Sequence, residues 1–434
     1  MSRGNRILPR RYVLVTVTFC LSVLLYVDRA CISAAKEPIE KSLALSDEQM
    51  GWILSSFALG YALFQAPAGL LADRLGPRKV LSAIAALWSI FTGLTAAASG
   101  YLSLISIRFL FGAGEAGAFP NMARATLAWI PMSERGIVQG INFSGSRIGA
   151  AAAMPLAALM IQAIGWRKSF LVLMAIGLGW SLFWYIWFRD DPSDDPTISR
   201  DELEFILANR QKLDKTEATT TLKLRTLVAS RGVRLMALQY FASNFTFFFC
   251  LTWLFPNLKS RFHLPPVQVG LYTAVPLVCG ALGNWASGLI VDRIYRSGRW
   301  IASRRVPAVI GYILAASGVL GYISATSPPG SIFWLSIALF GADMTLAPSW
   351  SFCIDIGKRH AGLVSGTMNM AGNIGSFATA IAFPYLLRWT GSTAPFFYLA
   401  AALNLGAAFV WLLADPRHAL EERVVADASG VDAL

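Results

Sequence analysis

Six ionisable side chains lie inside long apolar stretches of this chain, and they are its clearest candidates for chemistry. A carboxyl group in apolar surroundings favours its neutral form and can exchange a proton. An arginine stays charged, and its planar fork of donors suits a carboxylate or a sulfonate. Because a buried charge is costly, each of the six is by default a functional candidate. They are Asp28, Arg29, Arg108, Glu115, Arg147 and Asp343.

Arg108 and Glu115 are seven residues apart in one apolar stretch. In a helix they share a face but lie about 10 Å apart along the axis, so they cannot pair directly. Arg108 therefore needs a partner on another helix or in a ligand. Glu115 lies among glycines in apolar surroundings, which favours a proton carrier; a static salt bridge between helices is the alternative.

Asp28 and Arg29 are neighbours and point about 100° apart on a helix. One can therefore face a cavity while the other faces an adjacent helix. Tyr26 adds a hydroxyl donor close by.

The composition predicts an integral membrane protein. Hydrophobic residues make up 55% of the 434 residues and charged residues 14%, against about 45–50% and about 25% in typical soluble domains. Five scattered cysteines without a C-x-x-C pair predict neither a disulfide nor a metal site. The three histidines lie in polar connections or the tail. We expect no cofactor, because the G-x-G-x-x-G match at 112–117 lies inside an apolar span rather than after a strand.

Twelve apolar runs are long enough to cross a bilayer, which takes about 20 residues as a helix. The predicted fold is therefore all-α, with six spans in an N-terminal bundle (1–188), a cytoplasmic central loop (189–233), and six spans in a C-terminal bundle with a tail (234–434). The runs are 12–35, 50–72, 79–98, 101–122, 136–163, 166–188, 234–257, 268–291, 305–324, 330–353, 361–388 and 392–414.

The basic residues predict the orientation. Of the 37 lysines and arginines, 27 fall in the termini and the connections on one side and seven in the connections on the other. Because basic loops stay in the cytoplasm, both termini and the central loop are expected there. The net charge of +12 is thus an orientation signal, and no nucleic-acid partner is expected.

An internal repeat relates the two halves. GLLADRLGPRK at 69–79 follows the second span, and GLIVDR at 288–293 follows the eighth, 219 residues later. Parallel six-helix repeats are typical of transporters that rock about a midplane site. The first motif resembles the loop between helices two and three of the major facilitator superfamily. The resemblance implies that Asp73, Arg74 and Arg78 form a gate, with Asp73 capping a helix N-terminus in one conformation only; a tight turn with orientation charge is the alternative.

Motifs in four spans resemble the anion:cation symporter branch of that superfamily. They are YVDR at 26–29, GAGEAGAFPN at 112–121, NFTFFFCLTWLFP at 244–256 and NMAGNIG at 369–375. Bacterial sugar-acid and organic-acid permeases, sialin and the vesicular glutamate transporters belong to this branch. The resemblance implies that Asp28 and Glu115 bind coupling protons. It also implies a set of substrate contacts: Arg29, Tyr26, Tyr61, Arg108, Arg147, Ser349, Trp350 and Asn373.

The fifth predicted span (136–163) differs from that of the sugar-acid transporters of this branch. Characterised members use a glutamine where this chain has Ser146 and Arg147. If Arg147 faces the cavity, three arginines favour a substrate with two negative charges. Arg147 snorkelling or pairing with a loop acid is the alternative. Asp343 is either a third proton site or a partner for an arginine, and the sequence leaves this open.

The prediction is a secondary active transporter that imports a small organic anion by proton-coupled symport and alternating access. The anion is a dicarboxylate, a sulfonated carboxylate such as sulfoacetate, or a sugar acid. The alternative is a proton-driven efflux antiporter of the same fold, which would need an apolar cavity with few arginines. No enzyme constellation is visible. We expect a monomer in the bacterial inner membrane; sodium in place of protons, stoichiometry and the exact anion stay open.

Overall fold

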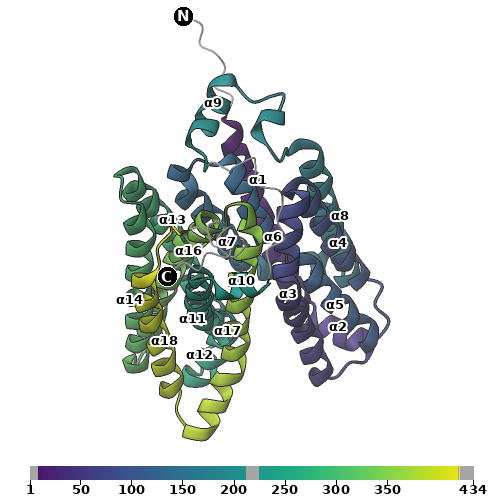
Figure 1. Ribbon diagram of the computed structural model, residues 1–434. Coiled ribbons are helices and arrows are strands. Elements are labelled where there is room, and N and C mark those ends of the chain that lie inside the picture. Colours follow the sequence, from purple (N-terminus) through teal and green to yellow (C-terminus); the bar gives the residue numbers. More distant parts are fainter. Residues whose placement is uncertain (1–7, 212–223, 419, 421–434) are drawn as a thin grey trace, which may run out of the picture.

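The computed structural model describes residues 8–211, 224–418 and 420. Within these residues every regular element is a helix, and the helices form two bundles side by side (Figure 1). The N-terminal bundle contains α1 (Arg10–Ala34), α2 (Lys36–Leu43), α3 (Asp47–Leu75), α4 (Pro77–Thr95), α5 (Tyr101–Glu115), α6 (Ala118–Trp129), α7 (Arg135–Ile164) and α8 (Trp166–Trp187).

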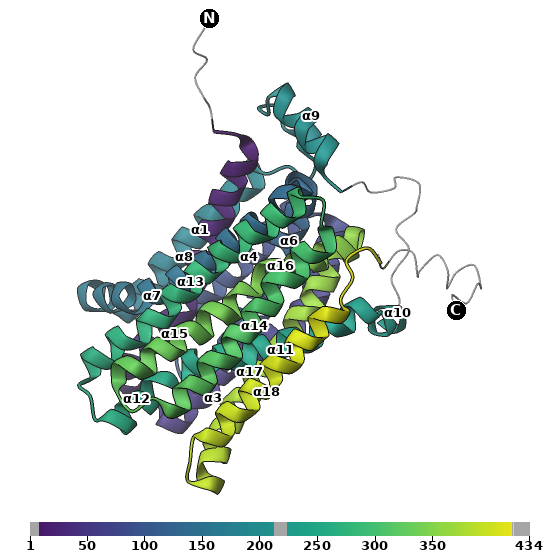
Figure 2. The ribbon, with the colours of Figure 1, turned by 90° about the vertical axis from the view of Figure 1, so that its left-hand side faces the viewer.

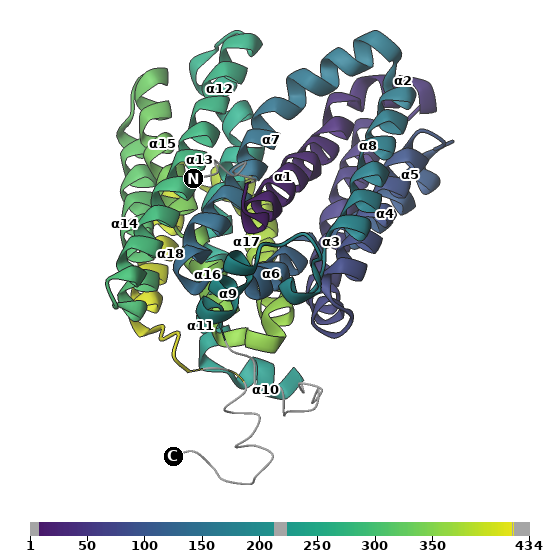
Figure 3. The ribbon, with the colours of Figure 1, turned by 90° about the horizontal axis from the view of Figure 1, so that it is seen from above.

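The C-terminal bundle repeats the pattern. It contains α11 (Arg231–Thr252), α12 (Leu254–Phe262), α13 (Pro266–Arg296), α14 (Trp300–Ser324), α15 (Pro328–Met344), α16 (Leu346–Gly357), α17 (Ala361–Thr390) and α18 (Ala394–Leu413). The view from above shows the two bundles apart, with α4, α5 and α8 on one side and α14, α15 and α18 on the other (Figure 3). Two short helices, α9 (Arg200–Asn209) and α10 (Leu224–Ala229), lie between the bundles in sequence.

Each of the twelve predicted spans coincides with a helix or a helix pair. By length and composition, nine segments of the described chain qualify as membrane spans, or ten when the two parts of α7, bent by 46°, count as one. One of the nine, Pro328–Thr390, holds two predicted spans. α4 does not qualify; it has 19 residues and begins with Pro77, Arg78 and Lys79. The predicted domain boundaries stay a prediction. The boundary placed at residue 234 lies within α11, which begins at Arg231.

The fourth span of each bundle is broken at an equivalent place. α5 ends at Glu115 and α6 begins three residues later, while α15 ends at Met344 and α16 begins after Thr345. Asp343 is the second-last residue of α15. The two intramembrane acids on these helices, Glu115 and Asp343, therefore lie at matching positions of the internal repeat.

The bundles are joined at the end that carries α9, which we call the α9 end. Asp73 of α3 accepts hydrogen bonds from the Gly362 and Leu363 amides at the start of α17, at 2.9 and 2.8 Å. In the repeat copy, Asp292 of α13 accepts from the Gly136 and Ile137 amides at the start of α7, at 2.8 and 2.9 Å. Each aspartate thus caps a helix of the opposite bundle, where a negative charge is favourable. These two contacts are the paired caps.

The helix backbones approach closely at the same end. A Cβ added to Gly69 would lie 2.1 Å from the carbonyl oxygen of Gly362. A buried charge network adds to the closure, because Asp355 of α16 pairs with Arg135 at 2.6 Å and with Arg304 at 2.8 Å. All three side chains are fully buried. The α9 end is therefore shut by glycine contacts, caps and ion pairs together.

The central segment is attached to the start of α1. Glu202 of α9 accepts hydrogen bonds from the Arg10 and Arg11 amides, and Arg10 forms a 3.0 Å ion pair with Asp195. Burial alone would raise the pKa of Asp195, but the Thr197 donors and the Arg10 guanidinium hold it below its ordinary value. Figure 2 shows α9 beyond the end of the bundle at which α1 begins.

We predict that removing both paired caps opens the α9 end. A helix cap contributes about 1 kcal/mol, and about 1 kcal/mol changes an equilibrium about fivefold. Asp73→Asn and Asp292→Asn together should therefore populate a state in which the α9 ends separate. The measurement is the distance distribution between spin labels at the exposed positions Lys79 and Ser297, in a background where the exposed Cys20 is serine. Asp194→Asn, an exposed aspartate in the central segment, is the control, and an unchanged distribution in the double variant would contradict the prediction.

Candidate functional site

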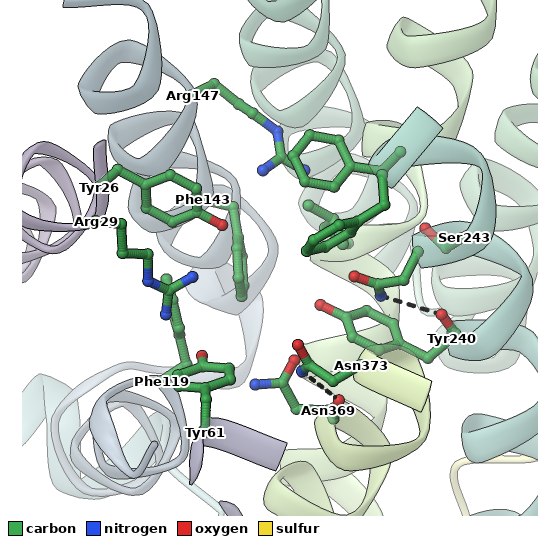
Figure 4. Close-up of a pocket in the computed structure, with 14 residues that line it drawn as sticks. Tyr26, Arg29, Tyr61, Phe119, Phe143, Arg147, Tyr240, Ser243, Asn369 and Asn373 are labelled. Carbon is green, nitrogen blue, oxygen red and sulfur yellow. Dashed lines mark hydrogen bonds between the residues drawn. The ribbon is translucent and has the colours of Figure 1, made fainter. Parts of the chain in front are cut away.

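A pocket lies between the two bundles and holds about 480 Å³ of empty space, part of it open to solvent. Figure 4 shows the guanidinium groups of Arg29 and Arg147 pointing into it from the N-terminal bundle, and Tyr240, Asn369 and Asn373 on the opposite wall. The lining residues are Tyr26, Arg29, Tyr61, Phe119, Phe143, Arg147, Tyr240, Ser243, Asn244, Phe247, Phe248, Leu346, Asn369 and Asn373.

Arg29 is the central cation of the N-terminal wall. Its Nε donates to Oε1 of Glu115 at 2.6 Å, and its guanidinium carbon lies 4.4 Å from the ring centre of Tyr61 and 4.8 Å from that of Tyr26. The Arg29 side chain is 18% exposed, whereas Glu115 is fully buried behind it. Within the described structure, Nη2 of Arg29 and Oε2 of Glu115 have no hydrogen-bond partner. Each member of the pair thus has one buried polar atom that makes no hydrogen bond within the described structure.

Arg147 is held by a different acid. Its Nε and Nη2 donate to the two carboxylate oxygens of Asp343, both at 2.6 Å, in a bidentate pair that joins α7 to α15. The guanidinium carbon lies 3.7 Å from the ring centre of Phe247. The structure therefore places Arg147 on the pocket wall, and its partner is an acid of α15, in the tenth predicted span, rather than of a loop.

Behind Arg29 lies a second cluster of charge that does not line the pocket. Asp28 accepts a hydrogen bond from Nε1 of Trp88 at 3.1 Å through one oxygen. The other oxygen, and Nε of Arg108, have no hydrogen-bond partner among the described residues. Arg108 lies against the rings of Phe111 and Phe57, at 4.3 and 5.3 Å. It can contribute positive potential to the pocket, but in this conformation it does not touch the pocket surface.

The close approach of α3 and α5 positions these groups. A Cβ added to Gly112 would lie 2.2 Å from the carbonyl oxygen of Phe57, and one added to Gly60 would lie 2.1 Å from that of Phe109. Larger residues there would separate the two helices. These contacts bring Tyr61 of α3 next to the arginine that pairs with Glu115.

The structure brings most of the expected substrate contacts together. Tyr26, Arg29, Tyr61, Arg147 and Asn373 line the pocket, whereas Arg108, Ser349 and Trp350 do not.

Ser349 and Trp350 are buried behind the lining. The Ser349 hydroxyl donates to the Thr345 carbonyl at 2.6 Å, and Nε1 of Trp350 donates to the Tyr240 hydroxyl at 3.1 Å. Trp350 therefore positions the Tyr240 hydroxyl, whereas the Ser349 hydroxyl bonds to the backbone one helical turn earlier.

Of the expected gate, Asp73 forms the cap described above. Arg78 donates through Nε to the Tyr185 carbonyl at 2.8 Å. Arg74 is exposed at the α9 end.

Several lining residues were not predicted as contacts, among them Tyr240, Asn244 and Asn369, whereas Asn373 was predicted. Asn369 and Asn373, and likewise Tyr240 and Asn244, are four residues apart and share a helix face. A pair of polar side chains at this spacing inside an apolar span is a signal that identifies the wall of α11 and α17. No cluster of metal-binding side chains occurs in the part of the chain that the structure describes.

The comparisons with known proteins agree with this architecture. The family model of the Major Facilitator Superfamily matches residues 18–380. Two solved transporters have the same fold. FucP in its outward conformation has a TM-score of 0.73 at 15% identity, over 92% of this chain and 98% of that one. The proton:xylose symporter XylE has a TM-score of 0.71 at 17% identity, over 96% and 98%.

Curated relatives are closer in sequence. A probable sulfoacetate transporter of Cupriavidus necator is 33% identical over 92% of each chain. The hexuronate transporter of Bacillus subtilis is 30% identical over 90% of this chain and 91% of its own, and a probable galactarate/D-glucarate transporter of Escherichia coli K12 is 31% identical over 87% and 88%. The predicted all-helical, twelve-span fold and the predicted family are confirmed, and the protein is a transporter rather than an enzyme. The chain belongs to the major facilitator superfamily, with relatives of the anion:cation symporter type.

Proposed function

We propose that this protein imports a small organic anion together with protons by alternating access. The observation that carries the proposal is that Arg29 lines the pocket and is neutralised there by the fully buried Glu115, at 2.6 Å. A permanently charged guanidinium cannot release a proton at neutral pH, so only the acid can change its charge. Protonation of Glu115 frees Arg29 for the carboxylate or sulfonate of a substrate.

Asp28 is the second proposed proton site. It is buried next to Arg29, and one of its oxygens is without a hydrogen-bond partner in the described structure. Import of an anion against a potential that is negative inside is opposed by about 2.3 kcal/mol per charge per 100 mV. Protons that enter with the substrate offset this cost. Release then follows when Glu115 and Asp28 lose their protons to the cytoplasm and Glu115 pairs with Arg29 again.

The substrate class follows from the arginines and from the relatives. Tyr26, Arg29 and Tyr61 offer donors and a cation to a carboxylate or sulfonate, and the asparagines of α17 offer donors to its hydroxyl groups. The named substrates of the relatives are sulfoacetate, hexuronates and galactarate or D-glucarate. We therefore propose a dicarboxylate, a sulfonated carboxylate or a sugar acid. Drug efflux is not favoured, because the pocket wall carries two arginines and the relatives named above are organic-acid transporters.

The α9 end is proposed to face the cytoplasm. The excess of basic residues at this end supports this orientation, which puts both termini inside the cell and the protein in a bacterial inner membrane. The paired caps close that end, so the described conformation has its pocket accessible from outside. The likeness to FucP in its outward conformation agrees with this assignment.

Loss of proton coupling is the expected result of Glu115→Gln. Glutamine mimics the protonated acid, so the variant should still exchange anion across the membrane, while a pH gradient should no longer drive accumulation. The measurement is uptake into proteoliposomes of sulfoacetate, glucarate and glucuronate, with a pH gradient, a sodium gradient or neither. Glu48→Gln, an exposed acid at the start of α3, is the control. Wild-type accumulation by Glu115→Gln would show that the proton site is assigned wrongly.

Arg29→Lys should weaken anion binding about tenfold or more. Lysine keeps the charge but loses the fork of donors and the contact of the guanidinium with the rings of Tyr26 and Tyr61. Calorimetry on the purified protein measures this affinity. Arg388→Lys, at an exposed arginine of α17, is the control for replacing an arginine by a lysine. Equal anion affinities of the two variants would exclude Arg29 as an anion contact.

A further inference from the structure

The Arg147–Asp343 pair has the features of a second, exchangeable site. Both side chains are nearly fully buried, at 5% and 2% exposure, yet Arg147 lines the pocket. Asp343 lies beside the break of the fourth helix of its bundle, as Glu115 does in the other bundle. Each of these repeat-related acids neutralises an arginine of the pocket wall. The two pairs are therefore equivalent in chemistry, although only the Arg29–Glu115 pair lies within one bundle.

We propose that Arg147 binds a second anionic group of the substrate, which displaces Asp343, and that Asp343 then carries a proton of its own. The inference rests on the proposed function and narrows its substrate class to small organic dianions. The proton comes from the outside water, adds to a carboxylate oxygen of Asp343, and leaves to the cytoplasm after the substrate has gone. No bond other than this O–H bond forms or breaks.

Charge balance requires the proton. Removing one partner of a buried ion pair costs about 3–5 kcal/mol, because the other charge stays buried and unpaired. If the substrate anion took over Arg147 while Asp343 stayed ionised, the pocket would gain an uncompensated negative charge. Protonation of Asp343 keeps the number of positive and negative charges equal. The same argument applies to Arg29 and Glu115, so each substrate group that displaces an acid from its arginine is matched by one proton on that acid. The proton proposed for Asp28, which accepts from Trp88 rather than from an arginine, comes in addition.

The packing around the pair holds the Asp343 carboxylate against α13 and leaves Arg147 on the pocket wall. Gly280 of α13 faces the carboxylate of Asp343, and a Cβ added there would lie 2.3 Å from Oδ2. Phe247 supports the guanidinium plane from the pocket side. Three other titratable groups interact electrostatically with the pair. Tyr26 of α1 and Tyr240 of α11 interact with Arg147, and Cys250 of α11 interacts with both Arg147 and Asp343. No second acid from these helices competes for Arg147 within the described residues.

The pair also spans the two bundles. Arg147 belongs to α7 and Asp343 to α15, and the bidentate contact joins the two bundles at the pocket wall. A substrate anion that displaces Asp343 from Arg147 therefore breaks this direct contact between the bundles. The substrate, bound to Arg147, then lies between them. A monoanion held by Arg29 leaves this contact in place. The pair thus discriminates dianions from monoanions of similar size.

The test compares wild type with the double variant Arg147→Gln/Asp343→Asn, in which neither charge is left alone. Binding to purified protein is measured by calorimetry for three matched anion pairs: glucarate and gluconate, malonate and propionate, sulfoacetate and acetate. Wild type should bind at least one dianion about tenfold or more tightly than its monoanion. The double variant should lose this preference, so that it binds the dianion and the monoanion of each pair about equally. Arg417→Gln/Asp415→Asn, a pair at 2.7 Å in the tail whose side chains are 60% and 17% exposed, is the control.

Proton uptake gives the second readout. Calorimetry in two buffers of different ionisation enthalpy counts the protons taken up with each dianion, and Asp343→Asn should take up one fewer than wild type. A dianion preference that persists in the double variant, or an unchanged proton count in Asp343→Asn, would overturn the inference and leave anion symport through Arg29 intact. Failure of all six anions to bind wild type would contradict the proposed function, and the inference would fall with it.

Discussion

Two arginine charges held between helices at the pocket wall determine how the rest of the molecule must work. A guanidinium cannot become neutral at physiological pH, so each one needs a negative partner in every state of the cycle. Here the partners are protein acids, Glu115 for Arg29 and Asp343 for Arg147. An acid can leave its arginine only by taking a proton or when an anion replaces it. In the proposed cycle, substrate binding and proton binding are therefore linked by the same ion pairs.

The internal repeat supplies both the closure and the acids. The paired caps cross between the bundles. Each bundle contributes one capping aspartate, and one of its own helices is capped by the aspartate of the other bundle. The breaks after Glu115 and Asp343 likewise occur once per bundle. Because the caps shut the α9 end while the pocket lies between the bundles, opening that end has to break contacts made by both repeats at once. This symmetry favours movement of the bundles as units over local gating.

The sequence predicts the fold and part of the site for clear physical reasons. Long apolar runs identify membrane helices, because hydrocarbon excludes charge, and a charge inside such a run identifies a candidate group such as Arg29. The rotation of each helix could not be predicted, since a span that is apolar all round has no stripe to mark its buried face. Ser349 and Trp350 therefore lie behind the lining, and Tyr240 was missed. The pairing of Arg147 with Asp343, 196 residues away, required the packed structure.

The most direct measurement is a structure of the purified protein with a bound dianion, determined at a pH low enough to protonate the acids. If the arginines bind the substrate, the anion lies between Arg29 and Arg147. The 2.6 Å contacts of these arginines with Glu115 and Asp343 are then broken. An anion bound elsewhere, with both arginines still paired to their acids, would contradict the central claim.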